Sequence, residues 1–127
     1  MVANPFANAK FNFAWEIPLS ISLFGSDFEI TASADAYYPT DEVTVEQNNA
    51  YQSFIENYKD IINNVEKLLL KESGSVELAE KRFTPKILKI KRNGNLGIVF
   101  DDKNDFENGL VISIFPSYEL MSTDEYF

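Results

Sequence analysis

Apolar and polar residues alternate in the first third of the chain, which is the pattern of a β-strand with one buried face. Every second residue is apolar over residues 19–23, and residues 28–35 resume this period after a turn at Gly25 and Ser26. Two alternating runs on either side of a short glycine-containing turn are typical of a hairpin. The pattern therefore predicts a β-hairpin over residues 17–36.

A period of three to four residues replaces the period of two in the middle of the chain. Apolar side chains recur at these steps up to Leu69, and charged or amide side chains fill the opposite face, as in an amphipathic helix. Thr44 and Gln47 have the spacing of a capping box at a helix start. We therefore expect one long helix from Thr44 to about Lys71, ended by a break at Gly74.

Alternation returns in the last third of the chain. Two apolar runs flank Asn93-Gly94, a dipeptide that strongly indicates a tight hairpin turn. Residues 109–115 form a third apolar run, which Pro116 ends. These runs predict three further strands, two of which form a hairpin.

Together the patterns predict an α+β fold with the element order ββ-α-βββ. In this fold a mostly antiparallel sheet of about five strands is covered on one face by one long amphipathic helix. A length of 127 residues fits a single domain, whose core needs no disulfide or metal. We expect one domain over residues 1–127, with residues 1–14 irregular and the second sheet face open to water.

Composition narrows the function. The chain contains no cysteine and no histidine, which excludes disulfides, thiolate nucleophiles, and imidazole as a base or metal ligand. Catalysis by two carboxylates stays open because it needs neither residue. No basic and apolar secretory signal and no long apolar stretch is found. We therefore expect a cytoplasmic protein that is not an enzyme, has no cofactor and does not enter a membrane.

The charge of the chain constrains its partner. The net charge of −9 disfavours binding to nucleic acid or an anionic membrane and favours a basic protein partner. Residues 84–95 carry four basic and no acidic side chains. We expect these bases to pair with nearby acids or to lie on a solvent-exposed strand face, because a nucleic-acid site needs a wider basic surface with aromatic side chains.

Acidic residues are densest just before the last predicted strand. Asp101, Asp102, Asp105 and Glu107 lie within seven residues. The EF-hand pattern needs oxygen ligands at alternate positions, and Lys103 stands at one of them when the loop begins at Asp101. The segment is therefore no EF-hand. It remains a polar connection between strands, an acidic docking surface for a basic protein, a carboxylate pair for catalysis, or another kind of cation site.

Tyr118 completes the set of candidate partner-binding residues. It lies in a C-terminal tail that mixes aromatic and acidic side chains, and tyrosine is enriched at protein interfaces. The leading hypothesis is a protein-binding domain in which the four acids steer a basic partner and an aromatic side chain anchors it. A homodimer built on the long helix is a further hypothesis.

Three features resemble a group of small uncharacterised bacterial domains, some of which are grouped with toxin-immunity-like proteins. They are the hairpin followed by the helix start at Thr44 and Gln47, the long helix, and the ending of residues 97–112. This ending is similar to a D-x-E-[HN]-G-L strand motif, with Asn108 where the group usually has histidine. The resemblance implies an α+β fold and a binding role, and it brings no established activity. An immunity-like neutraliser of a basic toxin is the most concrete version of the protein-binding hypothesis.

Overall fold

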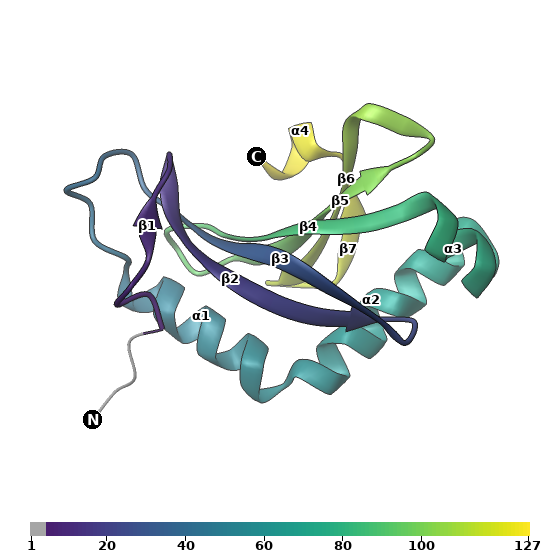
Figure 1. Ribbon diagram of the computed structural model, residues 1–127, viewed down its shortest axis with the longest axis horizontal. Coiled ribbons are helices and arrows are strands. Elements are labelled where there is room, and N and C mark those ends of the chain that lie inside the picture. Colours follow the sequence, from purple (N-terminus) through teal and green to yellow (C-terminus); the bar gives the residue numbers. More distant parts are fainter. Residues whose placement is uncertain (1–4) are drawn as a thin grey trace.

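Seven strands form one sheet, and they lie in it in the order in which they follow along the chain (Figure 1). The computed structural model describes residues 5–127. The strands are β1 (Lys10–Phe11), β2 (Ala14–Leu23), β3 (Ser26–Asp35), β4 (Phe83–Ile90), β5 (Leu96–Asp102), β6 (Asp105–Phe115) and β7 (Glu119–Met121). Neighbouring strands are antiparallel except β3 and β4, which run parallel.

The prediction of about five strands is wrong because it lacks β1 and β7. β1 has two residues and β7 has three, which is too short for an alternating pattern to be recognised. β1 also lies in the segment predicted to be irregular, of which residues 1–4 lie outside the described part. The two predicted hairpins are confirmed. The first turns at Phe24 and Gly25, both with positive φ, one residue earlier than expected.

The prediction of one long helix is also wrong. The connection between β3 and β4 holds three helices, α1 (Val45–Glu56), α2 (Tyr58–Ser73) and α3 (Val76–Arg82), and α4 (Thr123–Tyr126) lies near the C-terminus. Asn57 interrupts the predicted helix with φ −108° and ψ 23°. Its side-chain Nδ2 donates to the carbonyl oxygen of Ser53 at 3.0 Å. Such local side-chain bonds compete with regular helix geometry, and the apolar stripe continues across the break.

The start of α1 is fixed to the ends of two strands. Thr44 and Gln47 form the predicted capping box, with bonds of 3.0 and 2.9 Å. The buried Gln47 also donates through Nε2 to the carbonyl oxygens of Asp35 (2.9 Å) and Ile90 (3.1 Å). A buried amide that is satisfied in this way holds its neighbours in one arrangement. Gln47 therefore joins α1 to the parallel strands β3 and β4.

The core lies between the sheet and the helices. Figure 1 shows α1 and α2 along one sheet face and the short α4 on the other side. Fully buried side chains on the helical side include Phe54 and Val65, which pack with the strand residues Ile21, Leu88 and Ile98. Burial of such side chains from water is the main favourable contribution to folding.

The second sheet face is only partly open to water, which corrects the expectation of a wholly wet face. Over β5 it is covered by Tyr126 of α4, whose hydroxyl donates to the carbonyl oxygen of Lys89 at 3.1 Å. Burial, and secondarily the charge of Asp35, raises the pKa of the Tyr126 hydroxyl. Within residues 5–127 no helix is both long and apolar enough to cross a membrane.

Candidate functional site

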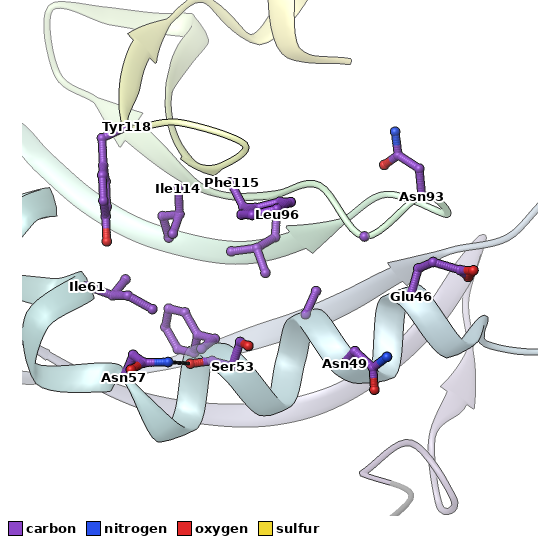
Figure 2. A pocket seen from close by; sticks show the side chains of 13 residues that line it. Glu46, Asn49, Ser53, Asn57, Ile61, Asn93, Leu96, Ile114, Phe115 and Tyr118 are labelled. Atoms are coloured by element: carbon purple, nitrogen blue, oxygen red, sulfur yellow. Dashed lines mark hydrogen bonds between the residues drawn. The ribbon is translucent and has the colours of Figure 1, made fainter.

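A groove of about 530 Å³ runs along α1 (Figure 2). It lies between this helix and the open end of the β5–β6 hairpin, where β5 begins and β6 ends. Its apolar floor is formed by side chains of the core. Polar side chains stand along its rim on both sides. The lining residues are Glu46, Asn49, Ala50, Ser53, Phe54, Asn57, Ile61, Asn93, Gly94, Leu96, Ile114, Phe115 and Tyr118.

One wall of the groove follows from helical spacing. Glu46, Asn49, Ser53 and Asn57 are three or four positions apart, so they lie on one face of α1 and its end. Figure 2 shows these side chains in a row along the helix. Of these four residues, the sequence pattern placed Asn57 on the polar face of the predicted helix. The sequence pattern did not show that the open end of the β5–β6 hairpin lies beside this helix face, so that the two together form a groove.

The other wall comes from residues far away in the chain. At one end lies the 91–95 turn, where Gly94 has φ +93°. A Cβ atom at this position would lie 3.0 Å from the carbonyl oxygen of Glu46, so the turn packs tightly against the start of α1. At the other end Tyr118 stands opposite Ile61 and Asn57 (Figure 2). Phe115, 57% exposed, lies between the two ends.

Several polar groups of the rim are free to bind a ligand. Figure 2 draws one hydrogen bond among the lining residues, from Asn57 to the carbonyl oxygen of Ser53. The side chains of Glu46, Asn49 and Tyr118 take part in no hydrogen bond or ion pair within the described chain. An apolar floor with a few convergent polar groups is the usual form of a binding site.

The predicted acidic surface is divided by the fold. Asp101 and Asp102 are adjacent on β5, so their side chains point to opposite faces of the sheet. Asp101 is exposed and lies 3.4 Å from Lys86 Nζ. Asp102 is 3% exposed and accepts two bonds from Arg82, from Nε at 2.8 Å and from Nη2 at 3.0 Å.

The remaining acids lie at the tip of the hairpin. Asp105 accepts a bond from the Nδ2 of Asn108 at 3.1 Å, and Glu107 is exposed. Tyr118 lies in the groove beside Leu96, which is at the other end of β5. The structure therefore does not bring Tyr118 together with the four acids.

The electrostatics of Asp102 fit an ion pair. The hydrogen bonds from Arg82 lower the pKa of the Asp102 carboxyl group despite its burial, and the same contact raises the pKa of Arg82. A general acid needs the opposite shift, towards neutral pH. In the part of the chain that the structure describes, no group of three or more acidic side chains is arranged to hold a metal ion.

Comparison with known proteins gives a family but no activity. No curated protein and no solved structure is significantly similar to the chain. A family model described as a domain of unknown function, DUF6985, matches residues 5–92, from the segment before β1 to the turn after β4. The resemblance to toxin-immunity-like proteins stays a prediction. Since the match covers more than half of the sequence, the chain belongs to the DUF6985 family of domains of unknown function.

Proposed function

We propose that this chain is a non-enzymatic protein-binding domain that takes a short segment of a basic partner protein in the groove beside α1. The observation that carries the proposal is the pairing of an apolar floor with polar rim groups that have no partner of their own. Groups of this kind cost little to leave in water, and they give orientation and specificity when a ligand arrives.

The length of the groove suits a peptide segment. Its helical wall extends from Glu46 to Asn57, which is about 16 Å at 1.5 Å per residue. An extended chain covers this distance with about five residues at 3.3 Å each. Side chains on one side of such a segment would contact Phe54, Leu96 and Ile114, and its backbone would meet the amides of the rim.

Charge supports a basic partner. Glu46 is the one charged side chain that lines the groove among the described residues. α1 carries Glu46 and Glu56 and no basic residue. The net charge of −9 adds long-range attraction for a basic protein, which raises the association rate more than the affinity. In this proposal the exposed Asp101, Asp105 and Glu107 steer the partner but do not form the contact.

The alternative is a carboxylate-dependent enzyme or a cation-binding protein that uses residues 101–107. It has less support because Arg82 already neutralises Asp102 and lowers its pKa. A cytoplasmic setting belongs to the proposal and agrees with the absence of cysteine. A neutraliser of a basic toxin is its most concrete version.

The test is selection of peptides from a randomised library on the immobilised protein. We expect enrichment of sequences that combine lysine or arginine with aliphatic residues. Ser53→Trp places a large ring on the groove rim and should abolish the enrichment. Ile55→Trp is the matched control, because Ile55 is exposed on the same helix but does not line the groove. Enrichment that persists in Ser53→Trp would place the binding surface elsewhere, and dimerisation through this face would appear in light scattering.

A further inference from the structure

A second, chemically different hollow lies on the other side of the 91–95 turn. It has a volume of about 540 Å³ and is formed where β2 begins and β3 and β4 end. Aromatic and basic side chains predominate in its lining. The lining residues are Phe13, Asp35, Ala36, Tyr37, Lys89, Lys91, Arg92, Asn93 and Phe127.

Two of its three basic groups have no carboxylate partner. Lys89 pairs with Asp35, Nζ to Oδ1 at 2.7 Å. Arg92 donates only to the carbonyl oxygens of Asp35 (3.0 Å) and Glu42 (3.1 Å), and Lys91 Nζ lies 4.2 Å from the centre of the Tyr126 ring. Neither Lys91 nor Arg92 takes part in an ion pair within residues 5–127. The hollow therefore carries a local positive charge on an acidic protein.

Three rings border these charges and are open to solvent. Phe13 is 92% exposed, Tyr37 81% and Phe127 65%. Phe13 has φ 62°, a left-handed conformation that is rare for a bulky residue. Exposed rings of this kind offer faces on which a planar group can stack.

We propose that this hollow binds a ligand that combines a planar aromatic ring with a phosphate group, joined directly or through a sugar. Lys91 and Arg92 supply the charge for the phosphate, since arginine and lysine form strong charge-assisted bonds to phosphate oxygens. Phe13 and Tyr37 supply the stacking faces. Of the four bases in residues 84–95, which were expected to pair with acids or to lie on an exposed strand face, Lys86 and Lys89 pair with Asp101 and Asp35.

The size of the ligand follows from screening. Charges more than about 8 Å apart are largely screened at physiological ionic strength, so a small phosphate meets the local positive charge. A long nucleic acid would also cover the acidic remainder of a chain with net charge −9 and would be repelled there. The site is therefore suited to a nucleoside monophosphate or a phosphotyrosyl group, which share this chemistry.

Calorimetric titration at 0.15 M salt tests the proposal with four probes. They are AMP, phenyl phosphate, adenosine and inorganic phosphate. We expect AMP or phenyl phosphate to bind on the order of tenfold more tightly than either adenosine or inorganic phosphate, since ring and phosphate contacts act together. Tighter binding of AMP would assign a nucleotide, and tighter binding of phenyl phosphate a phosphotyrosyl group. Equal affinities for adenosine and AMP would overturn the proposal. The proposal would also fail if neither AMP nor phenyl phosphate bound.

Variants separate the site from a general charge effect. Lys91→Gln and Phe13→Ala should each weaken binding of the tighter aromatic phosphate about fivefold or more. Lys86→Gln is the matched control, because it removes the same charge at a position on β4 that does not line the hollow. Equal weakening by Lys91→Gln and Lys86→Gln would contradict the proposal. Ser53→Trp should leave this binding unchanged, so the test stands independently of the peptide groove.

Discussion

The two ends of the β5–β6 hairpin differ in a way that the sequence hides. At the tip, four acids lie within seven residues, and three of them already have partners: Asp101 with Lys86, Asp102 with Arg82, and Asp105 with Asn108. At the other end, the side chains of Glu46, Asn49 and Tyr118 face a groove and have no hydrogen bond or ion pair within the described chain. Clustering of charge along a sequence therefore indicates which segment is exposed to solvent. A binding site needs unpaired polar groups that lie close together in space.

The largest expected effect on stability is a difference between substitutions of the two adjacent acids, Asp101 and Asp102. Asp102→Ala removes the buried partner of Arg82 and leaves it only the longer contact with Glu72 at 3.7 Å, which should lower the free energy of unfolding by about 3 kcal/mol. Asp101→Ala removes a solvent-exposed pair with Lys86 and should change it by less than about 0.5 kcal/mol. Urea denaturation measures both. Equal effects would contradict a larger contribution of the buried Asp102–Arg82 pair than of the exposed Asp101–Lys86 pair.

The second-largest expected effect on stability tests whether the backbone at Gly109 fixes the shape of the β5–β6 hairpin near its tip. Gly109 has φ +67°, and a Cβ atom there would lie 2.5 Å from the carbonyl oxygen of Phe100. Gly109→Ala should therefore cost about 2 kcal/mol, from overpacking and from an unfavourable φ. Asn108→Ala, at the neighbouring exposed position, is the control and should cost much less. A small loss of stability in Gly109→Ala would show that β6 can move away from β5 at this point.

The ion pair of Asp102 with Arg82 also predicts how the stability of the fold depends on pH. The pKa of Asp102 is lower in the folded chain than the value of about 3.9 in the unfolded chain. Its contribution to stability is therefore complete above the unfolded pKa and is lost as the pH falls through the folded pKa. The urea midpoint of the wild type should fall more steeply below about pH 4 than that of Asp102→Ala. Parallel curves would assign the acid sensitivity to other carboxylates.

The smallest expected effect is at the groove. Asn49→Ala and Tyr118→Phe remove polar groups that bond to nothing else in the described chain, so stability should change by less than about 0.5 kcal/mol. The same variants should weaken binding of any peptide selected on the wild type. A clear loss of stability in both would mean that these groups serve the fold and not a ligand.

Local patterns in the sequence were enough for the parts of the fold that local interactions decide. The hairpin turn at Asn93-Gly94 and the capping box of Thr44 and Gln47 are of this kind. The break at Asn57 was not visible because apolar side chains keep their helical steps on both sides of it. The groove could not be predicted because its two walls meet only through long-range packing.

Pairing of β3 with β4 has a consequence for the folding kinetics. Thr31 lies beside Ile87, so the strands meet only after a loop of roughly fifty residues has closed. Closing such a loop costs entropy before its contacts form, which slows folding. The β2–β3 hairpin and the β4–β7 meander can each form earlier from near neighbours in the chain. Gln47 bonds to the ends of both β3 and β4, so its side chain is satisfied only when the two halves have come together.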